Sequence, residues 1–228
     1  PGVGEGGSGV MRINLRVGFP GGMQAMAGNW CHPQQVAEQP EVCWSLDGQP
    51  SNELYTLMMV DPDAPSRANP IFGEWRHWHV VNIPGSDVAK GDVLAEYIPP
   101  APPVNTGLHR YIFILCSQSG VRIDTTTLPK LSGSSAADRA KFSARDFMQQ
   151  HNLKLQGLRF FQADYDDTVP SVYARLGEEA PVFPSEADLK YQKIRESKAT
   201  EKEARRITPR SGPRTRKFRN SSSEESAQ

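Results

Sequence analysis

The chain has 228 residues and carries 26 Lys and Arg against 26 Asp and Glu, so its formal net charge is zero and a uniformly basic nucleic-acid-binding protein is excluded. Hydrophobic residues make up 37% of the sequence, and the 19 Gly and 19 Pro disfavour a helical bundle. This composition predicts a loop-rich, mainly β protein with polar extensions, and the length allows one domain with appendages or two small domains.

The three cysteines have no short C-x-x-C spacing, which predicts neither a disulfide scaffold nor a zinc knuckle and suggests a reducing compartment. Cys116 falls inside an apolar strand, so we expect an inert buried thiol there. The longest apolar stretch, residues 54–60, is too short to cross a membrane. Because the sequence opens at Pro1 without a methionine, we expect it to be processed or incomplete, with any targeting peptide missing.

In chain order, residues 1–10 are rich in glycine and are predicted to form a flexible head. Residues 11–19 alternate between apolar and polar side chains, which is the period of a half-buried strand. Further strands, separated by clusters of Pro, Gly, Asn or Asp, are predicted at 41–45, 54–60, 78–83, 110–117, 121–125 and 160–165. Their number and spacing predict a β-sandwich, with a body that spans residues 11–183.

Two helices are predicted within this body. Between residues 137 and 151, Ala137, Ala140, Ala144 and Phe147 recur at helical spacing, which predicts an amphipathic helix on the edge of the sheet. A shorter helix is expected to begin near Pro170 and to stop at Gly177. Its buried face would comprise Val172, Tyr173 and Leu176.

Residues 184–228 are predicted to form an extension that is helical and then irregular. Ser185 and Asp188 resemble a capping box, so residues 185–207 are a candidate helix despite their few apolar positions. Beyond residue 208, Pro209, Gly212 and Pro213 break any helix.

The zero net charge is a cancellation between two unlike parts. Residues 1–189 hold 14 Lys and Arg against 21 Asp and Glu, a net of −7, whereas residues 190–228 hold 12 against 5, a net of +7. A run that is basic without any acidic residue binds RNA by counterion release, although it is equally typical of a solvated tail or a localisation signal. The candidate RNA-binding residues are Arg205, Arg206, Arg210, Arg214, Arg216, Lys217 and Arg219.

The densest group of polar residues follows the strand at 54–60 as D-P-D-A-P-S-R, residues 61–67. Its two prolines predict a rigid wall that leaves the sheet. In W-R-H-W-H, residues 75–79, His77 and His79 are predicted to share one strand face, because positions i and i+2 point the same way. A third histidine, His109, opens the strand at G-L-H-R-Y.

Three interpretations of these residues are open. Two histidines and a carboxylate form a common iron site, but the spacing matches no helical metal motif, so no metal is predicted. The histidines are otherwise either hydrogen-bonded core residues or part of an anion pocket. In that pocket imidazoles, the Tyr111 hydroxyl and backbone N–H groups donate to a phosphate or carboxylate while Asp61 orients a histidine.

Signatures of catalysis are missing from the sequence. There is no G-x-S-x-G elbow, phosphate loop or dinucleotide fingerprint, so nucleophilic catalysis has weak support and no cofactor is predicted. The adjacent Asp166 and Asp167 would point different ways in a strand and are interpreted as turn or helix-cap residues.

Five strings occur in one order: D-P-D-A-P-S-R at 61–67, E-W-R-H-W at 74–78, V-V-N-I-P-G at 80–85, G-L-H-R-Y at 107–111 and F-Q-A-D-Y-D-D-x-V-P at 161–170. Together they resemble the phosphatidylethanolamine-binding protein family over residues 11–177. The resemblance implies a β-sandwich of two sheets with a few peripheral helices and a non-enzymatic protein. It also implies an anion-binding pocket of Asp61, His77, His109 and Tyr111, with a wall shaped by Pro62, Pro65 and Trp75. Arg76 and His79, beside the pocket histidine, are features that could alter ligand preference.

The strings G-L-R-F-F-Q at 157–162 and E-A-P-V-F at 179–183, with the basic continuation, look similar to the branch of this family found in the mitochondrial large ribosomal subunit. That likeness implies a mitochondrial structural protein that contacts ribosomal RNA and neighbouring ribosomal proteins through its extensions. The alternative is a free-standing regulator, cytoplasmic and of the kinase- or protease-inhibitor type, that binds phosphate or a phospholipid headgroup.

Overall fold

The computed structural model describes residues 13–45, 47–48, 50, 52–184, 190 and 193–200. Its contacts divide the chain into two units, Pro1–Ser185 and Glu186–Gln228. The predicted head, residues 1–10, and the basic run, residues 205–219, lie outside the described residues.

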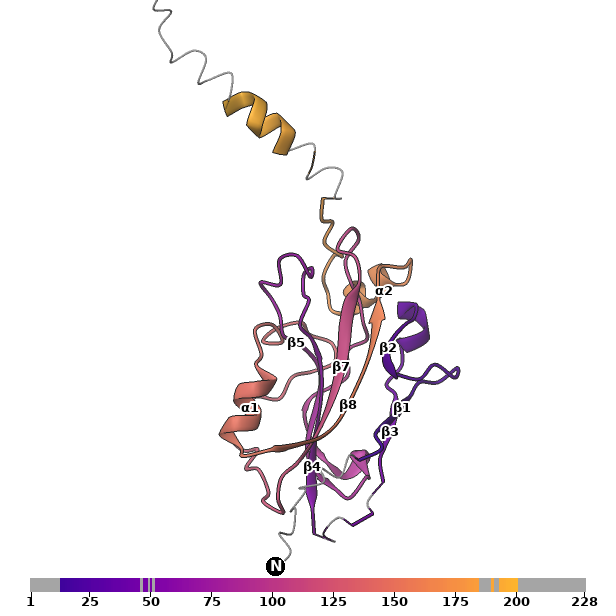
Figure 1. Cartoon of the computed structure of the whole chain (residues 1–228), viewed down its shortest axis with the longest axis vertical. Helices are drawn as coiled ribbons and strands as arrows, with labels where there is room; N and C mark the ends of the chain where they lie inside the picture. The colour runs from indigo at the N-terminus through magenta and orange to yellow at the C-terminus, as the bar shows by residue number, and fades with distance from the viewer. Residues whose placement is uncertain are drawn as a thin grey trace, which may run out of the picture. The chain divides into compact units, whose positions relative to one another are not determined.

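Two β-sheets build the first unit (Figure 1). The smaller sheet pairs β1 (Arg16–Gly18) with β3 (Glu41–Cys43). The larger sheet has, in spatial order, β2 (Ala27–Trp30), β8 (Lys154–Ala163), β7 (His109–Ser117), β4 (Leu54–Asp61), β5 (Trp75–Pro84) and β6 (Asp92–Ala95). Only β2 and β8 run parallel within it. The predicted mainly β sandwich with few helices is confirmed.

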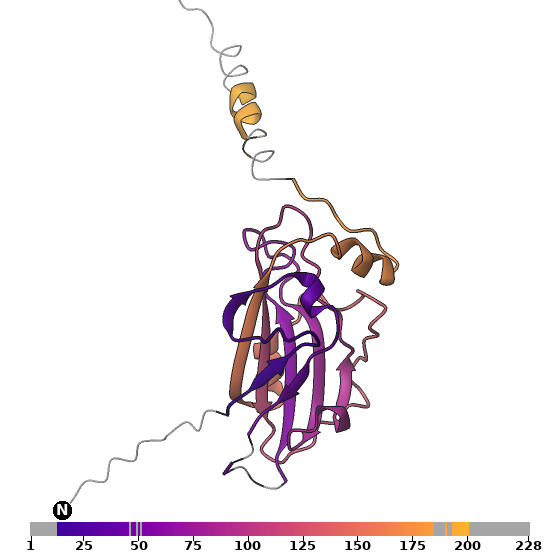
Figure 2. The same cartoon turned by 90° about the vertical axis from the view of Figure 1, so that its right-hand side faces the viewer.

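The main core lies between the small sheet and one face of the large sheet, as the views in Figures 1 and 2 show. Side chains at 13, 15, 17 and 19 are buried while those at 14 and 16 are exposed, so the predicted alternation is confirmed, although only Arg16–Gly18 forms ladder pairs. Leu15 and Val17 belong to the same buried cluster as Phe113 and Phe161 of the large sheet. Burial of this cluster supplies the main drive for folding.

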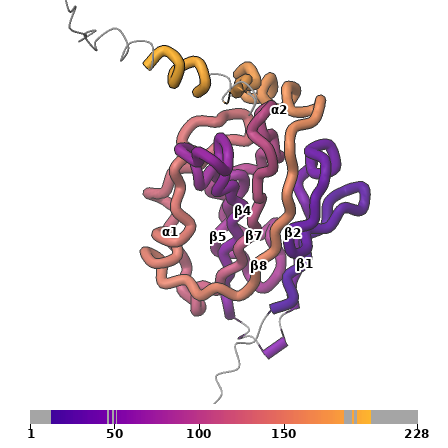
Figure 3. The backbone as a smooth tube through the Cα atoms, turned by 45° about the horizontal axis from the view of Figure 1, so that its top comes forward, coloured from indigo at the N-terminus to yellow at the C-terminus, as the bar shows by residue number. Residues whose placement is uncertain are grey.

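The helix α1 (Ala144–Gln150) covers the opposite face of the large sheet (Figures 1 and 3). Its Phe147 belongs to a second apolar cluster with Met58, Val81 and Cys116, which come from three strands. The prediction that this helix packs on a sheet edge is therefore wrong, since it packs on a face.

The same helix is shorter than the predicted 137–151. Asp138 and Lys141 have φ values of 59° and 57°, in the left-handed region, so a right-handed helix cannot run through them. Ser143 instead caps the N-terminus by accepting from the backbone N–H of Asp146. The residues at 137 and 140 matched helical spacing without being helical.

Of the other predicted elements, the helix near Pro170 is confirmed and the strand at 121–125 is wrong. The helix α2 (Val169–Arg175) ends just before Gly177, whose φ is 72°, and Val172 is buried, which confirms the predicted helix near Pro170. The strand predicted at 121–125 is wrong, because the backbone of Ile123 bonds to the side chain of Asn82 rather than to a strand. The short 3₁₀ helices Pro33–Val36 (η1) and Val88–Lys90 (η2) and the strands β2 and β6 were not predicted.

In the second unit, residues 190 and 193–200, the described part of the helix predicted at 185–207, are helical and exposed. Among the described residues, no helix has both the length and the apolar character needed to cross a membrane.

Candidate functional site

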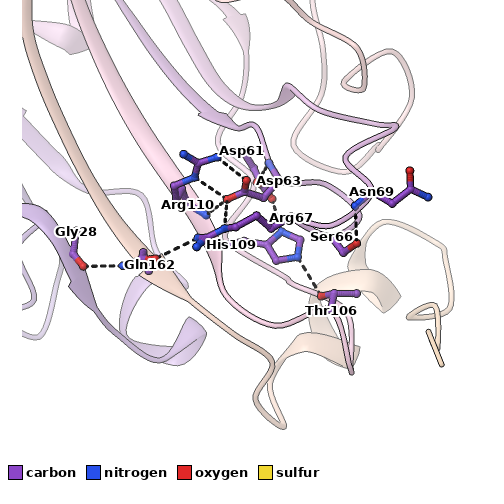
Figure 4. Close-up of polar contacts among 10 residues, drawn as sticks. All are labelled: Gly28, Asp61, Asp63, Ser66, Arg67, Asn69, Thr106, His109, Arg110 and Gln162. Atoms are coloured by element: carbon purple, nitrogen blue, oxygen red, sulfur yellow. Dashed lines mark hydrogen bonds and ion pairs between the residues drawn. The ribbon is translucent and has the colours of Figure 1, made fainter. Parts of the chain in front are cut away.

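A buried carboxyl–imidazole pair forms the centre of the candidate site (Figure 4). Asp61 is the last residue of β4 and His109 the first of the neighbouring β7, so sheet pairing brings the two side chains together. Nδ1 of His109 lies 2.7 Å from Oδ2 of Asp61, and both side chains are at least 95% buried. Burial raises the pKa of the Asp61 carboxyl, while its hydrogen bond with His109 opposes that rise.

Thr106 contacts the ring nitrogen of His109 that Asp61 does not, and it fixes the tautomer of His109. The Thr106 hydroxyl donates to the carbonyl oxygen of Pro103 at 2.7 Å, so its oxygen accepts from Nε2–H of His109 at 3.0 Å. With Nε2 protonated, the contact between Nδ1 and Asp61 needs one further proton, shared by the pair. Both nitrogens of His109 are therefore engaged within the protein.

His77 differs from His109 in that only one of its ring nitrogens is hydrogen-bonded among the described residues. Its Nδ1 lies 2.8 Å from the carbonyl oxygen of Ile98, which requires Nδ1 to carry a proton. Burial lowers the pKa of His77 to about 3, so the ring is neutral near pH 7 and Nε2 is a hydrogen-bond acceptor. The ring lies 5.1 Å from that of Tyr111, whose own ring stacks at 5.3 Å on Phe161 of the core.

A second carboxylate holds the turn after β4 in place. Oδ2 of Asp63 accepts from the backbone N–H and Nε–H of Arg110, both at 2.9 Å, and Oδ1 accepts from Nη2–H at 2.7 Å (Figure 4). Burial raises the pKa of Asp63, but the bonds from Arg110 outweigh burial and the net shift is downward. Backbone N–H of Asp63 also donates to Asp61 at 2.7 Å, which orients the pocket carboxyl.

Asp61, His77, His109 and Tyr111 line a cavity of about 440 Å³, a volume typical of sites for small ligands. Apart from Asp61, His77, His109 and Tyr111, few lining residues are polar. The apolar wall includes Phe72, Trp75, Ile98, Pro102, Pro103, Val172, Leu176 and Phe183. A wider groove of about 1120 Å³, lined in part by residues 37–43 and 86–89, contains none of the four polar pocket residues, so the smaller cavity is the candidate site.

The wall around Trp75 depends on a close backbone approach. A Cβ on Gly73 would lie 2.3 Å from the carbonyl oxygen of Pro62, so only glycine fits between the 61–67 segment and the start of β5. Pro62 itself does not line the cavity, whereas Pro65 and Trp75 do. The predicted wall is therefore built from the side chains of Pro65 and Trp75, and Pro62 only packs its backbone against Gly73.

A fully buried cation, Arg139, lies behind this wall. Its guanidinium donates to five carbonyl oxygens, those of Arg76, His77, Glu96, Ser132 and Ser135, and its carbon Cζ lies 5.6 Å from the Trp75 ring centroid. No described carboxylate bonds to it directly. Its charge helps to lower the pKa of His77 and favours an anion in the cavity.

The prediction that His77 and His79 share a face is wrong. Met59 pairs with Trp78 and Val60 with Arg76, so His77 is an extra residue in β5 and forms a β-bulge. Beyond the bulge His79 lies on the far face of the sheet, 4.5 Å from the Phe147 ring of α1. Arg76 lies on the same far face, over Phe142, so neither residue enters the pocket.

The structure thus brings together the four polar residues predicted for the pocket and places the RNA-binding candidates, Arg205 to Arg219, outside the described residues. Sequence reasoning missed Thr106, Arg139 and the ion pair of Asp63 with Arg110. The pair of Asp63 and Arg110 could have been found, because Asp63 shares a motif with Asp61 and Arg110 directly follows His109. In the described ranges no group of three His, Cys, Asp or Glu side chains is suited to a metal ion.

Two smaller predictions concern residues outside the pocket. Cys116 is a free, buried thiol whose pKa burial raises to about 12, which confirms the inert thiol. Asp166 accepts from the N–H and hydroxyl of Thr168 just before α2, as a turn or cap residue does.

Comparison with known proteins finds relatives that are similar to this chain in sequence. A family model described as phosphatidylethanolamine-binding protein matches residues 19–161. The putative odorant-binding protein A5 of Drosophila melanogaster is 32% identical over 164 residues, which cover 71% of this chain and 75% of that protein.

Solved structures agree with this assignment. The phosphatidylethanolamine-binding protein from Plasmodium vivax has a TM-score of 0.57 and 27% identity, with 68% of this chain and 86% of that chain covered. The carboxypeptidase Y inhibitor, solved with its cognate proteinase, has the same TM-score at 23% identity over 67% and 83% of the two chains, a likeness in fold. This chain therefore belongs to the phosphatidylethanolamine-binding protein family.

Proposed function

We propose that this chain is a non-enzymatic ligand-binding protein that holds the phosphate or carboxylate head of a ligand among Asp61, His77, His109 and Tyr111. The observation that carries the proposal is a group of four buried polar side chains in a cavity whose lining is otherwise mostly apolar. Buried polar groups that converge in an apolar cavity are the usual form of a small-ligand site. The names of the family and of the Drosophila relative support a binding role.

The protonation states define which anion fits. Neutral His77 accepts a hydrogen bond at Nε2, and the hydroxyl of Tyr111 can donate one. A singly protonated phosphate supplies both the proton for His77 and the oxygens that accept from Tyr111. Arg139, behind the Trp75 wall, adds a favourable potential for the negative charge.

Nothing in the cavity resembles an activated nucleophile, which supports a binding role over catalysis. Burial raises the pKa of Tyr111 well above its ordinary value, and Asp61 and both nitrogens of His109 are engaged with one another or with Thr106.

Isothermal titration with inorganic phosphate and with phosphoethanolamine tests this function. We expect saturable heat with the wild type and its loss in His109→Ala. His79→Leu is the matched control, because His79 lies on the opposite face of the same sheet, and it should bind as the wild type does. Absent heat for both ligands, or equal heat in His109→Ala, would contradict the proposal.

A second candidate function rests on the charge division. The +7 net charge of residues 190–228, attached to a −7 body, supports a role as a structural subunit of the mitochondrial large ribosomal subunit. The side chains of residues 193–200 are exposed. Co-sedimentation with large ribosomal particles in a sucrose gradient, sensitive to salt and lost when Arg205–Arg219 are neutralised, is the expected result. Sedimentation only as a free protein would exclude this role, and a cytoplasmic regulator would remain.

A further inference from the structure

The segment that follows α2, residues 178–183, contributes three side chains to the lining of the cavity, and we call it the strap. The chain turns at Gly177, and the N–H of Glu178 donates to the Tyr173 carbonyl at 3.0 Å. At its other end Val182 forms a parallel bridge with Val104, and Nδ2 of Asn105 donates to the carbonyl oxygen of Phe183 at 2.8 Å. The strap is therefore fixed at both ends.

The strap lies beyond the part of the chain that the family model matches, which ends at residue 161. Three of its residues, Glu178, Pro181 and Phe183, line the cavity. Val182 points away, with 80% of its surface exposed, while its neighbour Phe183 is half-buried. The strap thus adds two apolar side chains, Pro181 and Phe183, and the polar side chain of Glu178 to the lining of the pocket.

The apolar part of the lining comes from three segments. Phe183 and Pro181 of the strap line the cavity together with Val172 and Leu176 of α2 and Pro102 of the 99–103 loop. An inorganic anion would contact only the polar residues and leave this apolar wall in water. An alkyl chain attached to the anion would bury the wall, which is favourable for each methylene added.

We propose that the strap makes this pocket a site for an anionic amphiphile with a single short apolar tail, whose phosphate or carboxylate head binds at His77 and Tyr111, beside the Asp61–His109 pair. The inference rests on the proposed function and specifies its ligand class. A cavity of about 440 Å³ suits one small molecule, whereas the two tails of a bilayer phospholipid exceed it. Phe183 is the specificity-determining residue for the tail.

Isothermal titration of the full chain with inorganic, methyl, butyl and hexyl phosphate tests the tail. We expect affinity to rise about fourfold per methylene until the wall is covered. Phe183→Ser should weaken hexyl phosphate by ~10-fold or more and leave methyl phosphate within about twofold. Val182→Ser, on the outward side of the same strap, is the matched control and should change neither.

Each outcome separates the two proposals. Equal affinity for methyl and hexyl phosphate, or equal loss in Phe183→Ser and Val182→Ser, would overturn the single-tail site while leaving anion binding intact. No binding of any phosphate by the wild type would overturn both.

Hexanoate distinguishes a carboxylate head from a phosphate head. Vesicles of dioleoylphosphatidylethanolamine and phosphatidylcholine complete the test, since flotation with them would show that a two-tailed lipid is accepted and would contradict the inference.

If Phe183→Ser fails to fold, Asn105→Gly provides a second variant. It removes the hydrogen bond to the strap, and glycine accepts the φ of 66° at this position, so the lining side chains stay unchanged. It should weaken hexyl phosphate more than methyl phosphate, and equal affinities in the variant and the wild type would count against a role of the fixed strap.

Discussion

His77 and His79 lie on opposite faces of β5, although two positions separate them in the sequence. The bulge at His77 turns that ring toward Tyr111 in the pocket and leaves His79 against Phe147 of α1. Two histidines on one strand therefore have different surroundings and different expected behaviour.

The first prediction concerns His79, whose two ring nitrogens have no hydrogen-bond partner in the described part of the chain. An unpartnered buried imidazole costs about 1–3 kcal/mol, so His79→Leu should raise the free energy of unfolding by that amount. Urea denaturation at pH 7.5 measures it. His77→Leu is the contrasting variant, since it removes the bond to Ile98, and it should not stabilise the protein.

The acid sensitivity of the fold should also change in His79→Leu. Burial and the charges of Arg76 and His151 hold the pKa of His79 well below 6.5, so the unfolded chain binds the proton more readily. Stability is then fully present above about pH 6.5 and is lost as the pH falls below it. His151, whose pKa burial also lowers, and Arg76 are the groups that face His79 from α1 and from its own strand. A smaller stability loss between pH 7.5 and pH 5 is expected in the variant, and an unchanged loss would assign the acid sensitivity to other groups.

Much of the fold follows from the sequence because its signal is local. Side chains alternate between apolar and polar at 13–19 because one face of this segment is buried. The strand β4 is a mostly apolar run because both of its faces are buried. The pocket residues were identified by resemblance, and sheet pairing of β4 with β7 then explains why Asp61 and His109 meet.

What the sequence could not predict depends on long-range contacts. The bulge at His77 is set by pairing with β4, and the loop at 132–142 is held by Arg139, which bonds to carbonyls far away in sequence. Helical spacing at 137–151 could not reveal that Asp138 and Lys141 adopt left-handed backbone angles. The strands β2 and β6 have four residues each, too few for a periodic pattern.

The second prediction concerns the hydrogen-bonded line from Asp61 through His109 to Thr106. Asp61→Ala removes the partner of Nδ1 of His109 and the acceptor for the backbone N–H of Asp63, and it leaves both groups buried without a hydrogen bond. Asp61→Ala should therefore lower the free energy of unfolding by about 1–3 kcal/mol. In a double-mutant cycle with Thr106→Val we expect a coupling of ~0.5 kcal/mol or more, measured by urea denaturation. Additive effects would show that the three residues do not act as one line.

The third prediction concerns Gly73, whose Cβ position lies 2.3 Å from the Pro62 carbonyl oxygen. Gly73→Ala must push the Trp75 wall away from the 61–67 segment, and it should destabilise the fold by about 1–3 kcal/mol and weaken phosphate binding. Gly18→Ala is the control, because a Cβ there meets nothing within 4 Å. Thermal unfolding and phosphate titration of both variants check the expectation, which is wrong if the two alanines behave alike.

The fourth prediction is that anion binding takes up a proton. Free His77 has a pKa of about 3 and is neutral at pH 7, so either it gains a proton when an anion binds or it accepts one from a phosphate monoester, such as methyl phosphate, whose singly protonated form is lost above about pH 6. In both cases affinity should fall as the pH rises from 6 to 8.5, by at most about tenfold per unit for one linked proton. Titrations in two buffers of different ionisation enthalpy measure the uptake directly. His77→Gln keeps a side chain that can hydrogen-bond but does not titrate. Its affinity for phosphate should therefore depend less on pH than that of the wild type, and the remaining dependence should come from the ionisation of phosphate alone. Affinity that increases with pH in the wild type would show that the anion is not held against the neutral imidazole.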